Sequence, residues 1–177
     1  VWAACAYGLA SVTGHLRASY DALSSLLARQ AEAKPEVQAW VLSMLAEMAT
    51  RAGLNDAAEA HFRAALAIDP SDHYLLTAYS DWLLDQRRPS EVVTLLASQQ
   101  RADALLLRQT LALKQLGSPQ VDAGVEQLRA RFASSRLRGD RVHLREEARF
   151  TLELLGDQRA ALALARANWA IQKELPD

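Results

Sequence analysis

The stretch AWVLSMLAEMATRAGLNDAAEAHFRAALAIDP, residues 39–70, decides the fold class. Apolar residues recur in it at three- and four-residue spacing, in two runs that indicate two amphipathic helices. The first run holds Leu42, Leu45, Ala46 and Ala49, and the second holds Ala58, Phe62 and Ala65. Gly53 lies between the runs, where a chain leaving a helix takes positive φ at little cost. Asp69-Pro70 ends the second helix, so the stretch predicts a helix hairpin.

The composition extends this helical prediction to the whole chain of 177 residues. Half of the residues are hydrophobic, and Ala and Leu, both strong helix formers, are the most frequent. β-branched and aromatic residues are few, and most of the 7 Gly and 5 Pro fall between apolar runs. The fold class expected from these features is all-α.

Turn signals divide the chain into about five helix hairpins. The turns are expected at Gly14, Gly53, Arg87, Gly117 and Gly156. The hairpins cover approximately 1–30, 36–70, 72–100, 102–138 and 140–175. Pro35 suits the first turn of a helix, and N-caps are expected at Ser71-Asp72, at Ser90 and at Asp140. Because the sequence begins at Val1 and stops where a further repeat could begin, we expect it to be an excerpt of a longer chain.

Residues 39–70 resemble a tetratricopeptide repeat (TPR), in which a large apolar residue, Leu-Gly or Leu-Ala, Ala, Phe and Pro recur over 34 residues. The match is good for residues 73–98 and 150–172, although Leu96 and Ala165 replace the Phe. The run LLGDQRAALALARANWAIQKE, residues 154–174, also resembles repeats of bacterial proteins. The resemblance implies one right-handed superhelical solenoid over residues 1–177, in a soluble protein of the bacterial cytoplasm or periplasm. Armadillo and HEAT repeats, which are longer, are the structural alternative.

The resemblance also implies a site, because the first helix of each TPR hairpin lines a concave surface that binds peptides. In this sequence the ligand-facing offsets fall on Trp40, Ser43, Glu47, Thr50, Arg51, Tyr74, Thr77, Asp81, Leu84 and Asp85. They mix aromatic, hydroxyl and charged groups, as a peptide-binding groove does. The alternative interpretation is that Trp40 and Tyr74 only cover neighbouring helices.

The acidic residues at these offsets narrow the expected partner. Family members that clamp an acidic peptide terminus place Lys, Arg and Asn there, whereas this chain has Glu47, Asp81 and Asp85. We therefore expect a neutral or basic protein segment as partner. The net charge is −1, and the Arg-rich stretch after residue 128 is interleaved with acids, so no nucleic-acid partner is expected.

No motif points to catalysis, a cofactor or a metal. The sequence has no Gly-rich phosphate loop and no G-x-S-x-G elbow, and its one cysteine, Cys5, is expected to be a buried small hydrophobe. Asp140, His143 and Glu147 have a spacing that could bind a metal, but nearby arginines favour an ion-paired helix start instead. No apolar run is long enough to insert into a membrane.

The function expected from the sequence is a non-catalytic protein–protein interaction scaffold. Its partner segment would bind on the concave face of the solenoid. The alternative is a structural module that self-associates or packs against other parts of its own longer chain. Apolar residues such as Trp2 and Trp169 would then be covered by that neighbour.

Overall fold

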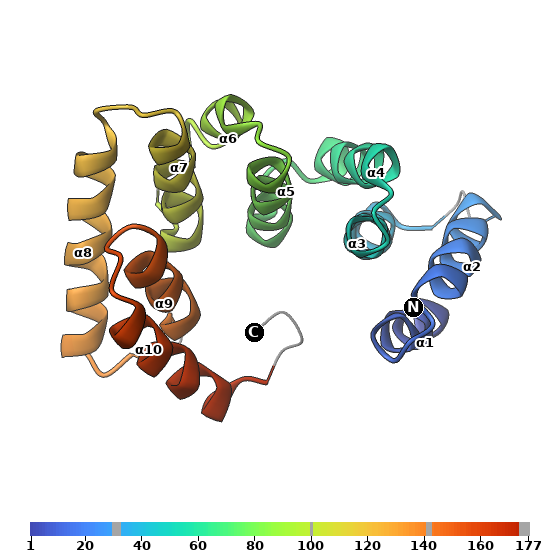
Figure 1. Ribbon diagram of the computed structural model, residues 1–177. Helices are drawn as coiled ribbons and strands as arrows, with labels where there is room; N and C mark the ends of the chain where they lie inside the picture. The colour runs from blue at the N-terminus through green and yellow to red at the C-terminus, as the bar shows by residue number, and fades with distance from the viewer. Residues whose placement is uncertain (30–32, 100, 141–142, 174–177) are drawn as a thin grey trace. The chain divides into compact units, whose positions relative to one another are not determined.

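The computed structural model describes residues 1–29, 33–99, 101–140 and 143–173, which form ten α-helices and no strand (Figure 1). The helices are α1 (Trp2–Val12), α2 (Leu16–Arg29), α3 (Pro35–Arg51), α4 (Asn55–Ile68), α5 (His73–Asp85), α6 (Pro89–Leu95), α7 (Asp103–Gln115), α8 (Val121–Leu137), α9 (Leu144–Glu153) and α10 (Gln158–Ile171). This confirms the all-α prediction. None of the described helices is both long and apolar enough to cross a lipid bilayer.

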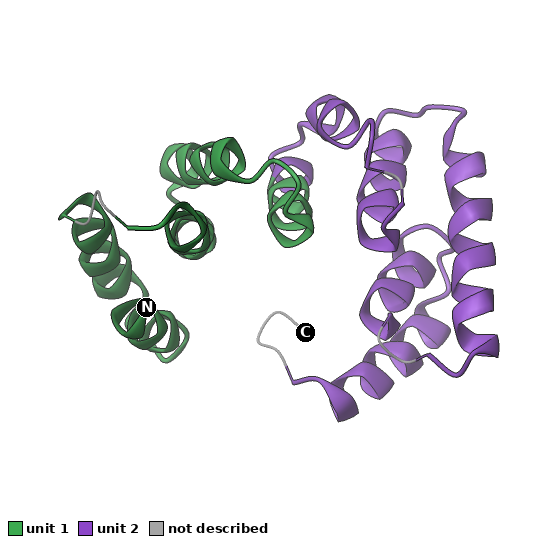
Figure 2. Ribbon diagram, turned by 180° about the vertical axis from the view of Figure 1, so that it is seen from behind, with its two compact units in different colours: residues 1–82 green, residues 83–177 purple. Residues whose placement is uncertain are grey.

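The chain divides into two compact units, Val1–Trp82 and Leu83–Asp177 (Figure 2). In unit 1, α1 packs on α2 and α3 packs on α4, and both α1 and α2 contact α3. In unit 2, α7 packs on α8 and α9 on α10, while α6 and α9 also contact α7. Four of the five expected hairpins are therefore pairs of contacting helices. The third, 72–100, is split by the boundary between the units, which falls within α5.

Every turn expected between paired helices contains a residue in the left-handed backbone region. These residues are Gly14, Gly53, Arg87, Gly117 and Gly156, with φ between 59° and 99°. At Gly53 the left-handed residue closes α3 with two reversed hydrogen bonds. Gly53 N donates to Thr50 O over 3.1 Å, and Leu54 N donates to Ala49 O over 2.9 Å. These bonds satisfy carbonyls that the helix end would otherwise leave without a partner.

Several helix ends follow the expected sequence signals. Pro35 is the first residue of α3, where a missing backbone N–H costs nothing. The carboxylate of Asp72 accepts from Tyr74 N at 2.9 Å and Leu75 N at 3.1 Å, so it caps α5 as predicted. Asp157 caps α10 in the same way through Ala160 N.

Three local predictions are wrong. Ser90 does not cap α6, because that helix already begins at Pro89 and Arg88 precedes it without a side-chain cap. Asp140 does not cap α9, which begins only at Leu144. A helix capped by Asp140 would begin at residue 141, which lies outside the described residues. Cys5 is exposed rather than buried.

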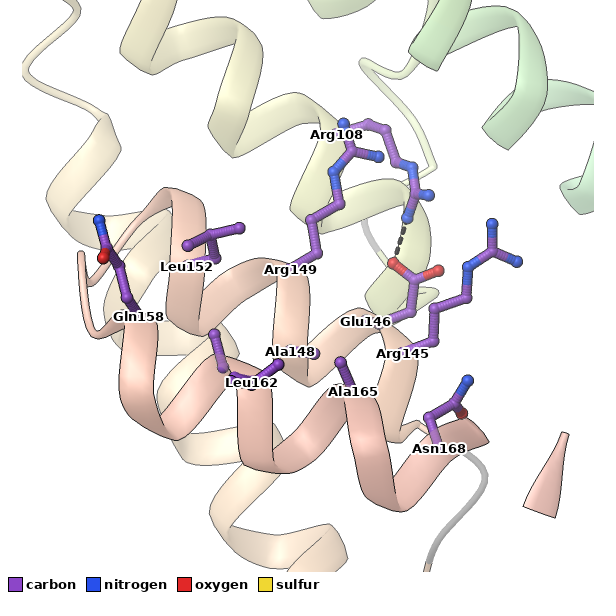
Figure 3. Close-up of a pocket in the computed structure, with 11 residues that line it drawn as sticks. Arg108, Arg145, Glu146, Ala148, Arg149, Leu152, Gln158, Leu162, Ala165 and Asn168 are labelled. Atoms are coloured by element: carbon purple, nitrogen blue, oxygen red, sulfur yellow. Dashed lines mark hydrogen bonds and ion pairs between the residues drawn. The ribbon is translucent and has the colours of Figure 1, made fainter. Parts of the chain in front are cut away.

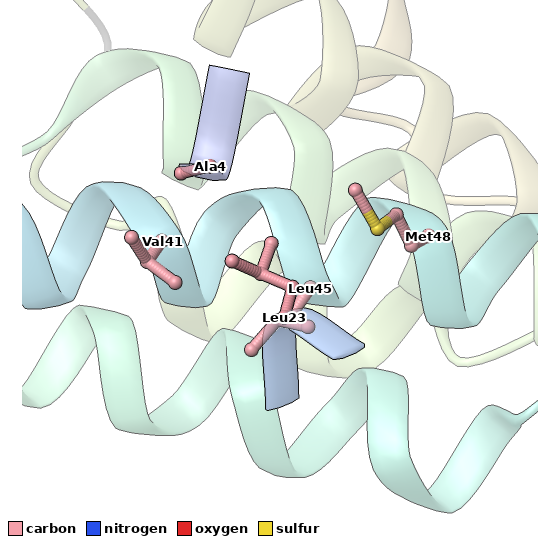
Figure 4. Packing of buried hydrophobic residues seen from close by; sticks show 5 residues of the cluster. All are labelled: Ala4, Leu23, Val41, Leu45 and Met48. Carbon is pink, nitrogen blue, oxygen red and sulfur yellow. The ribbon is translucent and has the colours of Figure 1, made fainter. Parts of the chain in front are cut away.

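The core of unit 1 joins its first three helices. Ala4 of α1, Leu23 of α2, and Val41, Leu45 and Met48 of α3 form one buried cluster (Figure 4). All five side chains are at least nine-tenths removed from solvent, which is the main source of stabilisation in such a unit. The packing shows that α3 is the central helix of unit 1.

Aromatic rings pack α4 against α5. Phe62 of α4 stacks on Tyr79 of α5, with ring centroids 5.1 Å apart, and Tyr79 stacks on Trp82 at 5.9 Å. Phe62, Tyr79 and Trp82 are buried. Offset aromatic pairs at these separations add to the stabilisation from area burial alone. The helix α5 is thus fixed against the α3–α4 hairpin by its aromatic face.

In unit 2 the helix α9 covers the α7–α8 hairpin. Phe150 of α9 lies 5.3 Å from Phe132 of α8, ring centroid to ring centroid, and both are buried. Two ion pairs flank this contact. They are Arg108 of α7 with Glu146, and Arg136 of α8 with Glu147. Because Arg108 and Glu147 are almost fully buried, each needs its partner to offset the loss of hydration.

We expect Arg87→Gly to stabilise unit 2. Arg87 has φ 59°, which costs a residue with a side chain about 1 kcal/mol and costs glycine almost nothing. After the entropy that glycine adds to the unfolded chain, a gain of roughly 0.5 kcal/mol remains. Urea denaturation followed by circular dichroism measures it. The control is Ala52→Gly at φ −83°, which should give no gain; a lower stability of Arg87→Gly than of the wild type would contradict the assignment.

Two helical glycines should respond differently to substitution by alanine. A methyl group on Gly124 of α8 would lie 2.4 Å from Oγ1 of buried Thr110 on α7, so the two helices must separate. We expect Gly124→Ala to destabilise the protein by about 1–3 kcal/mol, although alanine is the better helix former. At Gly8 the near atom is only the end of the flexible Met44 side chain. Gly8→Ala should therefore change the unfolding free energy little, and equal losses in both variants would contradict the close approach of α7 and α8.

Candidate functional site

A groove of about 670 Å³ opens in unit 1 between α3, the end of α4 and the start of α5. One face of α3 forms its long wall, because Glu36, Trp40, Ser43 and Glu47 recur at three- and four-residue spacing. Tyr74 of α5 also lines the groove. The groove thus gathers four of the ten residues that the sequence predicted as a partner-binding surface. Those four are Trp40, Ser43, Glu47 and Tyr74.

The aromatic residues of the groove expose much of their surface to solvent. Trp40 is 40% exposed and Tyr74 is 64% exposed. Aromatic rings held open beside a groove supply a large contact area at a small cost in side-chain entropy. Ser43, in contrast, is buried, and its hydroxyl donates to Ala39 O at 2.9 Å. It contributes to the wall of the groove with its hydrogen bond already made within α3.

A hydrogen bond joins two of the residues that line the groove. The hydroxyl of Tyr74 donates to Oε1 of Glu47, and so links α5 to α3. Burial raises the pKa of Glu47 above its usual value, against the opposing effects of the Tyr74 hydroxyl and the Arg51 charge. Desolvation favours the neutral form of a carboxyl group, whereas a donated hydrogen bond and a nearby cation favour the charged form. Glu47 is therefore a carboxyl group that is poorly hydrated in the free protein.

The groove is acidic. Besides Glu36 and Glu47 it is lined by Asp69 and Asp72 at the α4–α5 junction, and none of its lining residues is Lys or Arg. The backbone N–H and then the hydroxyl of Ser71 donate to Asp69 and lower its pKa, so this carboxylate stays charged at neutral pH. The acidic wall matches a neutral or basic ligand.

The other predicted residues lie outside the lining of the groove. Three of them make local or structural contacts. Thr50 and Thr77 donate back to the carbonyls of Ala46 and His73. Arg51 reaches Ser11 of α1, with 2.8 Å between Nη2 and Oγ, and so ties the end of α3 to α1.

The last three predicted residues, Asp81, Leu84 and Asp85, fall on the second half of α5. Leu84 is buried, Asp81 is half-buried and Asp85 is exposed. Sequence reasoning missed Glu36, Asp69 and Asp72. Glu36 could have been found from its position one helical turn before Trp40, since such residues share a face.

Two of the three residues whose spacing could bind a metal, Asp140 and Glu147, form ion pairs with arginines. Within the described part of the chain, no group of three His, Cys, Asp or Glu side chains could hold an ion. Glu147 pairs with Arg136, and Asp140 pairs with Arg138 at 3.0 Å. These contacts match the interpretation of this stretch as ion-paired.

The raised pKa of Glu47 predicts how pH changes stability. At a pH above the pKa of Glu47 in the folded protein, the carboxylate is charged and poorly hydrated, so it opposes folding. At a pH below the pKa of Glu47 in the unfolded chain, about 4.3, the group is neutral in both states. The wild type should therefore gain stability relative to Glu47→Gln as the pH falls from 7 to 4. Urea denaturation at both pH values tests this, with Glu36→Gln as the control on the same helix. A difference between Glu47→Gln and the wild type that does not change with pH would contradict the desolvation of Glu47.

Neither a family model, a curated protein nor a solved structure matches this chain. The resemblance to TPR repeats consequently stays a prediction from the sequence. The groove itself carries the features that bear on function: exposed aromatic rings, an acidic wall and the hydrogen bond between Tyr74 and Glu47.

Proposed function

We propose that this protein is a non-catalytic interaction scaffold that binds a neutral or basic segment of a partner protein in the groove of unit 1. One observation carries the proposal: Trp40 and Tyr74 are both exposed on the walls of a groove that contains four carboxyl groups. The aromatic rings would hold apolar or cationic side chains, including those of Lys and Arg over a ring face. The carboxylates would favour positive charge in the segment.

We further propose that the helices belong to a right-handed TPR-like solenoid of a bacterial protein. Support comes from the turns, where a left-handed residue occurs at each position expected from the repeat pattern. The contacting pairs α1–α2, α3–α4, α7–α8 and α9–α10 provide the hairpins that such repeats require. In that family the first helix of each hairpin binds ligands, and α3 is the first helix of its pair.

A second candidate function is self-association, or packing against other parts of a longer chain. It is favoured by large apolar side chains that are exposed away from the groove. Trp2 is 91% exposed on α1, and Leu137 and Ile171 are also exposed in unit 2. Exposed apolar side chains supply the surface that an interface buries. Sedimentation distinguishes the two functions, because self-association makes the measured mass rise with protein concentration.

The binding test starts from peptides selected for affinity to this chain by display of a random library. We expect the selected peptides to be rich in Lys, Arg and apolar residues, and to bind more weakly as salt increases. Trp40→Ala with Tyr74→Ala should lower their affinity at least about 30-fold, roughly 2 kcal/mol, because both rings would be central contacts. Fluorescence anisotropy measures the affinity, and circular dichroism checks the fold.

The matched control is Trp2→Ala, which removes an exposed ring of the same unit that does not line the groove. This variant should bind the selected peptides as the wild type does. The proposal fails if the double variant keeps its affinity while remaining folded. It also fails if the selected peptides that lose affinity for the double variant are predominantly acidic.

A further inference from the structure

A second groove of about 670 Å³ lies in unit 2, between α9 and α10 (Figure 3). One face of α9 supplies Arg145, Arg149 and Leu152, and the facing side of α10 supplies Leu162 and Ala165. Leu152 is 49% exposed and Leu162 is 53% exposed. The small side chain of Ala165 leaves room above α10, so a third helix could approach closely. The groove is an open hairpin face with apolar walls.

The charge of this groove is opposite to that of the groove in unit 1. Arg145 and Arg149 stand one helical turn apart along α9, and Arg108 reaches the same space from α7. The acidic residue in the lining is Glu146, and it is already bound by Arg108. Arg149 also pairs with Glu153, with 2.7 Å between Nε and Oε1. The arginines therefore outnumber the carboxylates that line the groove.

Another hairpin of this chain that carries arginines, α7–α8, is covered by a helix in the structure. The α7–α8 hairpin carries Arg108 and Arg136 beside the ring of Phe132, and α9 lies over it. That covering helix brings an aromatic ring and two adjacent carboxylates. The three residues are Phe150, Glu146 and Glu147. A covering helix in this protein is thus amphipathic, with acidic residues beside its apolar face.

We propose that the α9–α10 groove docks an acidic amphipathic helix of a partner protein. Apolar residues of that helix would lie against Leu152 and Leu162. Its carboxylates would meet Arg145 and Arg149, as Glu146 and Glu147 meet the arginines of the preceding hairpin. This site differs from the groove of unit 1 in its location and in the sign of its charge, so the protein would bind two chemically different partners.

The probe is a short hydrocarbon-stapled helical peptide that carries Glu, Glu and Phe at the spacing of Glu146, Glu147 and Phe150, with Ala elsewhere. We expect the labelled peptide to bind the full chain in fluorescence anisotropy. Arg145→Glu with Arg149→Glu should lower the affinity at least tenfold. A peptide with Lys in place of both Glu should bind at least tenfold more weakly to the wild type.

One control variant and one further test variant separate binding in the groove from general effects of charge. Arg129→Glu with Arg166→Glu makes the same change in net charge at exposed positions that do not line the groove, and should bind as the wild type does. Ala165→Trp fills the groove without changing charge and should also abolish binding. If the arginine variant unfolds in circular dichroism, Ala165→Trp carries the test.

Three results would overturn the proposal. The first is equal binding by folded Ala165→Trp and the wild type. The second is equal binding of the acidic and the Lys peptides. The third is a concentration-dependent dimer that the arginine substitutions abolish, since the occupant would then be a second copy of this chain. Trp40→Ala with Tyr74→Ala should still bind the acidic peptide, so failure here is distinct from failure of the groove in unit 1.

Discussion

A hairpin of two helices leaves one apolar face uncovered, and the next helix along the chain has to cover it. Both units of this protein satisfy that constraint with an aromatic contact. In unit 1 Tyr79 of α5 stacks on Phe62, and in unit 2 Phe150 of α9 packs on Phe132. The covering helix also creates the grooves. The start of α5 closes one side of the acidic groove through Tyr74, and α9 presents its outer face to α10.

The turns could be predicted from the sequence because they depend on local chemistry. A glycine between two apolar helical runs signals a left-handed helix end, and Gly53 has the expected backbone. Arg87 carries no such signal by itself, and the turn was predicted from the Arg88-Pro89 that follows it. In the structure Arg87 has positive φ, and the backbone N–H groups of Arg87 and Arg88 donate to carbonyls at the end of α5. Asp72 was likewise predictable as a cap, because a cap bonds only to residues two or three positions away.

Burial was predicted less completely. The buried face of α3 was expected to be a single stripe that includes Leu45, yet Val41 and Met48 are buried as well. The reason is tertiary: α3 is contacted by α1 and α2 as well as by α4, so more than one side of it is covered. Cys5 shows the same limit, since burial depends on neighbours that a single-sequence pattern does not specify. The Ser90 prediction failed for a local reason, because Pro89 already begins α6.

The candidate site was predictable only along α3 and at Tyr74, where helical spacing identifies a shared face. The sequence alone did not show that the guanidinium of Arg51 would donate a hydrogen bond to Ser11 instead of lining the groove. It also did not show that Asp69 and Asp72 would line the same groove as Glu47. The helix α4 separates them from Glu47 in the sequence. Asp69 and Asp72 lie there because α4 packs on α3, which places the α4–α5 junction beside the groove-lining face of α3.

The desolvated carboxyl of Glu47 makes ligand binding and proton binding interdependent. If a Lys or Arg side chain enters the groove, its charge lowers the pKa of Glu47, which burial raises. At a pH where Glu47 is partly protonated, the group therefore releases protons on association. Calorimetry in buffers of different ionisation enthalpy would then record a binding heat that depends on the buffer. Acidification would weaken the complex without any change in the ligand, so this groove would hold a basic segment less tightly in an acidic compartment.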